Sequence, residues 1–186
     1  VTKSYLTLHL AKCLQTGDPF IGHFEVKEKV PVLIIDKENG LRRIQKRLQG
    51  LNAPVDAEIY LLKYPEQFQI TDAEFMESVA NLIKFRGIKV VILDSFVDLM
   101  VGNENSAGDT NEVFNAIRSI STEVVWAAVH HESKPMPRFQ RSAGQRTRGS
   151  SNIIAQVDAS FNLEKTKAHG IIHIEQGKAR DEEPIH

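Results

Sequence analysis

The amino-acid sequence predicts an α/β fold with a largely parallel sheet, and three observations lead to it. The run from Lys89 to Ser95, KVVILDS, has branched apolar residues in succession, as in a parallel strand covered on both faces. Similar runs at Val30 to Asp36 and Ala57 to Lys63 alternate with helical patterns. Several strands end in polar residues, and ligands bind beyond the carboxyl ends of such strands. Asp94 is therefore expected to meet a metal or a phosphate, or else to cap a turn or helix.

The length and composition bound the class of protein. A chain of 186 residues is long enough for one substantial domain, which we expect to span residues 1–186. Hydrophobic residues make up 41% of the chain and charged residues 25%, as in ordinary globular proteins. The formal net charge is −1, so any binding of nucleic acid would have to come from a local basic patch.

Cysteine content and hydropathy indicate the compartment. The single cysteine, Cys13, excludes an internal disulfide framework and suits a reducing compartment, so we expect a cytoplasmic protein. Cys13 lies in an apolar helical run and is expected to be a packed structural thiol. No apolar run approaches the roughly 18 residues that a membrane-spanning helix needs, and we expect no membrane partner.

The first helix carries the first functional signal. Leucines recur at helical spacing between Ser4 and Gln15, and Gly17 is expected to end this helix. Lys3 and Ser4 stand immediately before it, like the end of a phosphate-binding loop, G-x-x-x-x-G-K-[ST]. In such a loop the lysine reaches the β- and γ-phosphates and the hydroxyl holds Mg²⁺. The competing interpretation is a chance Lys-Ser pair.

The glycine-rich part of that loop is not in this sequence. Thr2 stands where its second glycine is expected, and the chain opens on Val1 rather than on methionine. We therefore expect a fragment that lacks the upstream part of the loop. A glycine at the position of Thr2 would let the backbone wrap a phosphate more closely.

The remaining elements follow from periodicity and turn residues. We expect a polar loop between Leu99 and Thr110. Thr71 is expected to cap the helix that runs to Arg86. The predicted helices are Leu41 to Leu51, Thr71 to Arg86 and Asn111 to Ile120, and the predicted later strands are Lys89 to Asp94, Glu123 to Val129, Ala159 to Leu163 and Gly170 to Glu175.

Polar residues that could carry chemistry follow several of these strands. Glu38 comes just after Asp36, and His130 and His131 follow the strand that ends at Val129. A long basic segment lies between Glu132 and Ser151, and a loop of that length is usually functional or disordered. Its basic residues are Lys134, Arg138, Arg141, Arg146 and Arg148, and Lys178 and Arg180 follow the last predicted strand. The alternatives are a helix cap at Glu38, ordinary strand-end histidines, a solvated turn at Lys178 to Arg180, and a disordered surface loop.

In this order the motifs resemble those of the RecA-like P-loop ATPases of the AAA kind, and among them the hexameric replicative helicases of the plasmid RepA type. The resemblance covers nearly the whole chain, from Val1 to about Pro184. It rests on IIDKEN with Arg47 nine residues after Glu38, on VVILDS with the ENSAGDTNEV loop, and on VHHESK and RGSSNIIAQVDAS. It implies a RecA-like three-layer P-loop NTPase core with a largely parallel sheet, and ATP and Mg²⁺ as cofactors.

The resemblance also implies a role for each matching residue. Lys3 and Ser4 match the Walker A lysine and hydroxyl, after Thr2, and Asp94 matches the Walker B aspartate that holds Mg²⁺ through water. The other implied roles are a water-activating carboxylate at Glu38, an arginine near the nucleotide base at Arg47, γ-phosphate sensors at His130 and His131, and a finger pair for the neighbouring subunit at Lys178 and Arg180. Phosphoryl transfer needs such groups, because its catalysis is mostly positioning and charge neutralisation.

The implied activity is that of an ATP-dependent, ring-forming DNA motor. The basic segment and the loop after Asp94 would face the channel of a homo-oligomeric, hexameric ring and bind single-stranded DNA without reading its sequence. Two alternatives stay open. One is a recombinase-like or regulatory ATPase that does not unwind DNA. The other is a catalytically weak paralogue that serves as a DNA-binding or oligomerising module.

Overall fold

The computed structural model describes residues 2–63, 69–100, 102, 106–130, 151–166 and 170–180. The chain divides into two compact units. The first comprises Val1–Val101 with Asn115–His130, and the second comprises Gly102–Phe114 with His131–His186. The expectation of a single domain over residues 1–186 stays a prediction. No helix among the described residues is long and apolar enough to cross a membrane.

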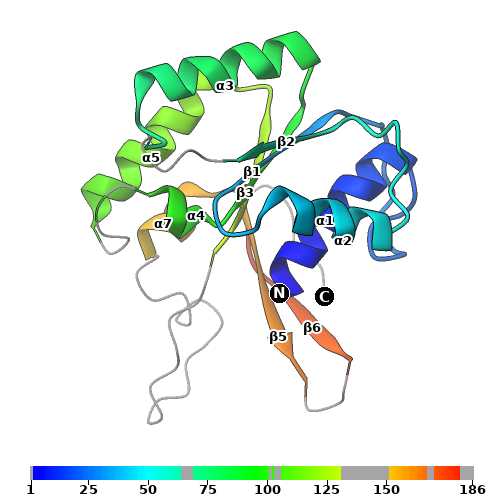
Figure 1. Ribbon diagram of the computed structural model, residues 1–186. Helices are drawn as coiled ribbons and strands as arrows, with labels where there is room; N and C mark the ends of the chain where they lie inside the picture. The colour runs from blue at the N-terminus through cyan, green and yellow to red at the C-terminus, as the bar shows by residue number, and fades with distance from the viewer. Residues whose placement is uncertain are drawn as a thin grey trace. The chain divides into compact units, whose positions relative to one another are not determined.

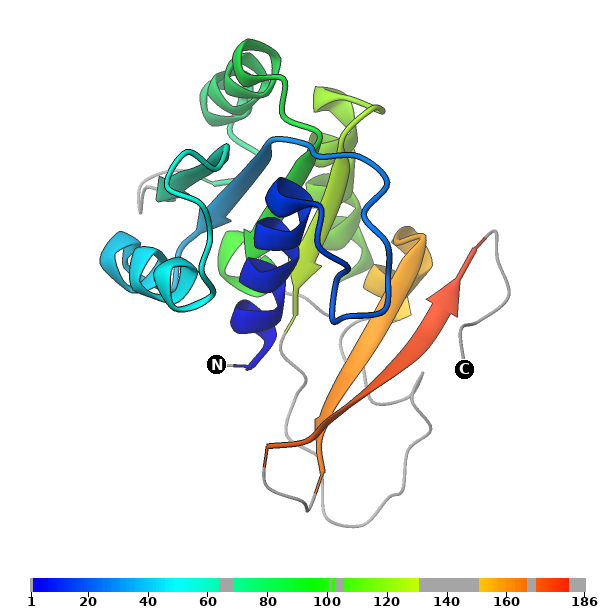
Figure 2. The ribbon, with the colours of Figure 1, turned by 90° about the vertical axis from the view of Figure 1, so that its right-hand side faces the viewer.

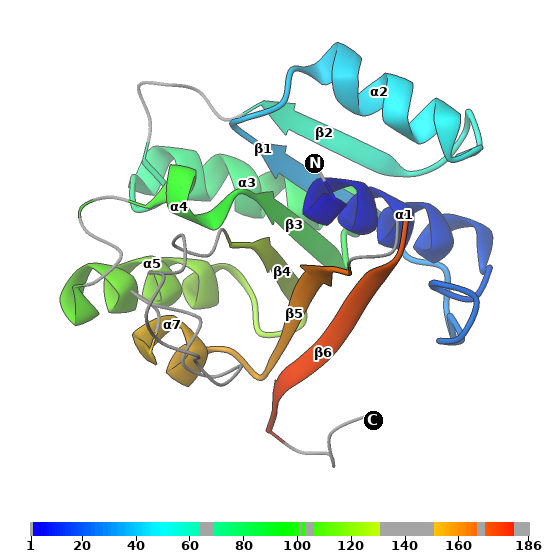
Figure 3. The same cartoon turned by 90° about the horizontal axis from the view of Figure 1, so that it is seen from below.

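A sheet of four strands organises the first unit. Its strands are β1 (Val32–Asp36), β2 (Ile59–Lys63), β3 (Val90–Asp94) and β4 (Val125–Val129). Figure 3 shows them side by side in the order β2-β1-β3-β4, and every neighbouring pair is parallel. All residues of β1 and β3 are buried, which explains why their sequences lack the alternation of a half-exposed strand.

Helices cover both faces of this sheet (Figure 1). Between β1 and β2 the chain forms α2 (Leu41–Gly50), and between β2 and β3 it forms α3 (Ala73–Arg86). These two crossovers run in opposite directions across the sheet, and right-handed connections therefore place α2 and α3 on opposite faces. The first helix, α1 (Thr2–Thr16), lies on the α2 side, where Figure 2 shows it in front of β1 and β3.

One face of α1 is buried in the core between α1, α2 and the sheet. Leu8 and Ala11 are buried in one cluster with Ile34 and Ile92 of the sheet and Ile44 of α2. The leucines at positions 6, 10 and 14, which suggested the helix in the sequence, are only half-buried. The helix itself is confirmed, and Gly17 ends it in the left-handed region at φ 80°, where its N–H bonds to the Cys13 carbonyl at 2.8 Å.

The second unit contains a short helix and a hairpin. The helix is α7 (Ser151–Gln156), and the strands are β5 (Ala159–Lys165) and β6 (Ile172–Ala179). β5 and β6 are antiparallel, with a register shift between Ser160 and Phe161. The sequence predicted both strands but ended them too early, and it did not predict α7.

Several predicted boundaries are wrong. Asp72, not Thr71, occupies the cap position of α3, and its carboxylate accepts a hydrogen bond from the Gln69 N–H at 2.7 Å. The predicted loop between Leu99 and Thr110 is too long, because α5 (Ala107–Ile120) begins inside it. A short helix that was not predicted, α4 (Phe96–Leu99), precedes it. Thr110 is fully buried inside α5 and donates its hydroxyl to the Ser106 carbonyl at 2.9 Å, so its polarity is satisfied locally.

Candidate functional site at the carboxyl edge of the sheet

Two buried carboxylates lie next to each other where the central strands end. Asp36 ends β1 and Asp94 ends β3, and the two residues are register partners in neighbouring parallel strands. Their exposed fractions are 2% and 4%. Carboxylates are rarely buried unless they are hydrogen-bonded or bind a cation, so each of these two needs a donor or a cation beside it.

Asn39 connects the two carboxylates. Its Nδ2 donates to Asp36 Oδ2 at 3.0 Å and to Asp94 Oδ2 at 3.4 Å, and its backbone N–H donates to Asp36 Oδ1 at 2.6 Å. Its Oδ1 accepts a hydrogen bond from Nη1 of Arg47, in α2, at 3.3 Å. Arg47 thus contacts the carboxylate pair through a buried amide, a connection that the sequence did not indicate.

The surroundings of Asp36 shift its pKa upward from the ordinary value. Burial raises the pKa of Asp36, and the negative charges of Asp94 and Glu38 act in the same direction, while hydrogen bonds from Asn39 oppose them. Desolvation is the largest of these causes, because a carboxylate loses its water when it is buried between packed strands. The edge of the sheet is therefore a place where added positive charge is favourable.

Lys3 brings such a charge to the same edge. Its Nζ donates to the backbone oxygen of His130 at 2.8 Å. His130 directly follows Val129, and Val129 is the register partner of Asp94. The sequence suggested that Lys3 and Ser4 stand before the first helix. In the structure both lie in the first turn of α1, and Ser4 is buried. The structure therefore places the predicted lysine, Asp94 and His130 together at one edge.

Glu38 lies beside this group, on the segment that leaves β1. It is exposed, two positions after Asp36. Hydrogen bonds hold the residues on either side of Glu38. The Lys37 N–H bonds to the Asp94 carbonyl at 3.1 Å and Lys37 Nζ to the Asp98 carbonyl at 2.9 Å, and the Asn39 N–H bonds to Asp36 Oδ1. An exposed carboxylate on a fixed segment has the access to solvent that a water-activating residue needs.

The oxygen donors at this edge fit Mg²⁺ better than they fit a permanently bound structural metal. The part of the chain that the structure describes holds no group of three or more His, Cys, Asp or Glu arranged for a metal. Mg²⁺ commonly needs only one or two carboxylates, because substrate phosphates and water complete its shell. Asp94 supplies a carboxylate and Ser4 a hydroxyl, which suits that mode of binding.

The predicted finger pair is engaged within the second unit. Lys178 lies inside β6 rather than after it, and its Nζ donates to the carbonyls of Ile154, Ala155 and Val157 at 2.7, 3.3 and 2.7 Å. Arg180 Nη1 pairs with Asp158 Oδ1 at 2.6 Å. Lys178 therefore caps the end of α7, where a cation is favoured by the free carbonyls and the helix dipole.

Several predicted site residues lie outside the described residues, as does the side chain of Thr2. They are His131, Lys134, Arg138, Arg141, Arg146 and Arg148. Their roles in phosphate sensing and DNA binding stay predictions.

Sequence reasoning missed Asp36 and Asn39. Both stand in the motif IIDKEN, from which only Glu38 was selected. The available signal was the register: a carboxylate that ends one parallel strand lies beside the carboxylate that ends its neighbour. Strand order, which the sequence does not give directly, was needed to know that β1 and β3 are neighbours.

The chain is similar to known proteins in sequence and in structure. The sequence profile of one family, described as an AAA domain, matches residues 1–136. A KaiC-like protein from the hyperthermophilic archaeon Pyrococcus horikoshii OT3 aligns with a TM-score of 0.62 over 96% of this chain and 75% of that one. The two share 12% sequence identity, so this similarity shows the fold alone, and it confirms the predicted RecA-like α/β fold. No curated protein matches the sequence.

Proposed function

The chain belongs to the AAA domain family, and we propose that it is a RecA-like ATPase that binds ATP and Mg²⁺ at the carboxyl edge of its sheet. The observation that carries this proposal is the gathering of Lys3, Asp94 and His130 at one edge, from segments far apart in the sequence. Ligands of open α/β sheets bind at this edge. An ammonium group and a carboxylate are the pair needed there for a metal-bound triphosphate.

Each residue of the proposed site has a role that its geometry permits. An ammonium group has three N–H donors. Lys3 uses one of them on the His130 carbonyl, and the others can bind phosphate oxygens. Bound Mg²⁺ would neutralise charge on the β- and γ-phosphates, and Ser4 and Asp94 would hold it. Glu38 would orient and deprotonate the attacking water, which requires the solvent access that it has.

We propose further that the protein works as a ring-forming DNA motor of the replicative helicase kind. The resemblance in sequence supports a hexameric ring in which Arg180 and Lys178 serve the site of a neighbouring subunit. The basic residues between positions 134 and 148 would bind the phosphates of single-stranded DNA. An arginine finger is worth about 10³–10⁵ in rate, so hydrolysis would depend on assembly.

The test is ATP turnover by the full-length protein, with and without single-stranded DNA, together with strand displacement on a forked duplex. Wild type should hydrolyse ATP, and single-stranded DNA should stimulate it. Lys3→Ala should weaken ATP binding. Glu38→Gln should lower turnover by about 10²–10⁴ while ATP still binds, because a catalytic base supplies about that factor. Glu77→Gln, an exposed glutamate of α3, is the matched control and should behave as wild type.

The outcomes separate the candidate activities. Turnover with strand displacement supports the helicase. Turnover without displacement supports a recombinase-like or regulatory ATPase instead. A protein that forms rings or DNA complexes but never hydrolyses ATP would be a catalytically weak paralogue. Absence of both ATP binding and turnover in wild type overturns the proposal.

A further inference from the structure

The side chain of Asn39 is fixed by partners of opposite kinds. Its exposed fraction is 7%. Its Nδ2 faces the carboxylates of Asp36 and Asp94, and its Oδ1 faces the guanidinium of Arg47. Ionised carboxylates can only accept hydrogen bonds and a guanidinium can only donate them. A rotation of the amide by half a turn would set oxygen against oxygen and N–H against N–H, so the chemistry of these partners permits one orientation.

Asn39 also limits how the two carboxylates can move. Asp36 and Asp94 are register partners, and the Nδ2 of Asn39 donates a hydrogen bond to the Oδ2 atom of both. Two buried carboxylates side by side repel each other, and a shared donor compensates part of that repulsion. The backbone N–H of Asn39 holds the other oxygen of Asp36. Rotation of the Asp94 carboxylate is therefore coupled to Asn39, and through Asn39 to Arg47.

We propose that Asn39 is a positioning residue for Asp94, and that Arg47 acts through Asn39 rather than on the nucleotide base. This inference rests on the proposed function, in which Asp94 holds Mg²⁺. Arg47 is half-buried, on the last turn of α2, and its hydrogen bond locks the amide that orients the carboxylates. Partners that orient a metal ligand commonly change metal affinity or activity by about 10–100-fold when they are removed.

The experiment measures steady-state ATP turnover by the full-length protein over a range of Mg²⁺ concentrations. We compare wild type with Asn39→Ala and with Arg47→Met, which keeps the length of the side chain but removes its donors. Asn39→Ala should raise the Mg²⁺ concentration for half-maximal turnover by about tenfold or more and lower kcat by a similar factor. The KM for ATP at saturating Mg²⁺ should change little, because the inference gives Asn39 no contact with the nucleotide. Arg47→Met should show the same pattern more weakly.

The control is Asn81→Ala, which removes an exposed asparagine from α3 and should match wild type. If wild type is active and Asn39→Ala has the Mg²⁺ dependence and kcat of this control, the inference is wrong and the proposed function stands. If Asn39→Ala does not fold, Arg47→Met decides. A raised KM for ATP with unchanged Mg²⁺ dependence would place Arg47 on the nucleotide and overturn the inference. A wild type that neither binds nor hydrolyses ATP overturns the proposed function and this inference together.

Discussion

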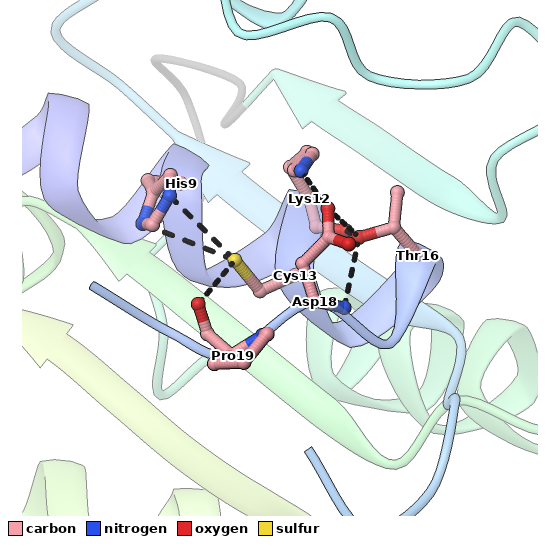
Figure 4. A network of polar contacts seen from close by, with 6 residues as sticks. All are labelled: His9, Lys12, Cys13, Thr16, Asp18 and Pro19. Atoms are coloured by element: carbon pink, nitrogen blue, oxygen red, sulfur yellow. Dashed lines mark hydrogen bonds and ion pairs between the residues drawn. The ribbon is translucent and has the colours of Figure 1, made fainter. Parts of the chain in front are cut away.

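At the residue scale, Cys13 shows how burial determines the chemistry of a side chain. Its exposed fraction is 0%, and its Sγ lies 3.6 Å from His9 Nε2 and 3.8 Å from the Pro19 carbonyl (Figure 4). Burial raises the pKa of the thiol above its ordinary value of 9.0, and this exceeds the lowering by the positive charge of Lys12. The thiolate is the reactive form, so the structure predicts an inert, structural cysteine.

This inertness is directly measurable. In folded protein at mildly alkaline pH, Cys13 should react with a disulfide reagent at least about tenfold more slowly than in urea, because reaction requires local opening. The reaction is followed by the absorbance of the thiol that the reagent releases. The chain has one cysteine, so this absorbance reports Cys13 alone, and Cys13→Ala gives the background rate. Equal rates in folded and unfolded protein would contradict the prediction.

The raised pKa also makes stability depend on pH. The unfolded chain releases the Cys13 proton near its ordinary value of 9.0, whereas the folded chain holds it to higher pH. The contribution of the neutral thiol is therefore complete below that value and is lost as the pH rises above it. The free energy of unfolding should fall more between about pH 8 and pH 10 in wild type than in Cys13→Ala. Parallel curves from urea titrations of the two proteins would show that the shift is absent.

Single residues also mark the limit of prediction from the sequence. Asp94 and Lys3 were selected because each stands at the end of a recognisable element. Asn39 carries no such signal: its importance comes from Asp94, 55 positions away, and from Arg47 on the next helix. Hydrogen bonds between distant side chains depend on strand order and register, which a single sequence does not encode in any local pattern.

At the element scale, local signals predicted most helices and strands, and Gly17 did so for the end of α1 through its backbone geometry. Gly87, which was not used to predict the end of α3, has the same role there. Gly87 ends α3 at φ 62° and ψ 30°, and its N–H bonds to the Ile83 carbonyl. A Cβ added there would meet nothing within 4 Å, so only the backbone conformation opposes a side chain. The start of α5 was predicted too late, because the residues before position 111 are polar and polar runs are typical of loops. In the structure the Ser106 hydroxyl accepts a hydrogen bond from the Asp109 N–H at 3.3 Å, in the first turn of the helix.

Gly87→Ala therefore isolates the cost of the left-handed conformation. We expect a loss of about 1 kcal/mol in the free energy of unfolding. Gly40→Ala is the control, because Gly40 has φ −69° and ψ 148°, which alanine adopts freely, and it also has open space around its Cα. Urea titration of the two variants measures the difference. Equal stability would show that α3 can end without a left-handed residue.

The ammonium group of Lys178 has both an observed and a proposed role. The observed role is the cap on α7, and the proposed one is a contribution to a neighbouring subunit. Lys178→Met should lower stability by about 1 kcal/mol, a value reduced because the side chain is half-exposed. Lys165→Met, at an exposed position of β5, should stay within about 0.5 kcal/mol of wild type.

The two roles of Lys178 give different results when thermal unfolding and ATP turnover are measured together. Lower stability with normal turnover supports the cap alone. Unchanged stability with strongly reduced turnover contradicts the prediction and supports the finger role. A loss of both, absent from Lys165→Met, shows that the cap and the finger use the same side chain.

At the scale of the whole molecule, the sequence predicted the fold class for a physical reason. Parallel strands buried on both faces need continuous apolar runs, and β1 and β3 have them. Convergence of their carboxyl ends follows from the parallel arrangement, so Asp94 could be expected near a site before the strand order was known. The division of the chain into two units had no comparable signal, because no change in composition marks it.

The two sheets should differ strongly in local stability. Every residue of β1 and β3 is buried, with exposed fractions of 9% or less. In the described part of the chain, β5 and β6 pair only with each other, and Phe161 and Ile172 are 52% and 41% exposed. A hairpin of two strands with exposed apolar residues is marginal by itself, whereas central buried strands open only when the domain unfolds.

Amide hydrogen exchange of the protein without nucleotide tests this difference. Amides of Val32–Asp36 and Val90–Asp94 should exchange most slowly, and those of β5 and β6 should exchange at least about 100-fold faster, because local opening frees the hairpin without breaking the buried sheet. Trp126 fluorescence in β4, followed over the same urea series, reports the main sheet separately. If the hairpin and the main sheet exchange at one common rate, the two units unfold together. That result would contradict the prediction and would support the single domain expected from the length of the chain.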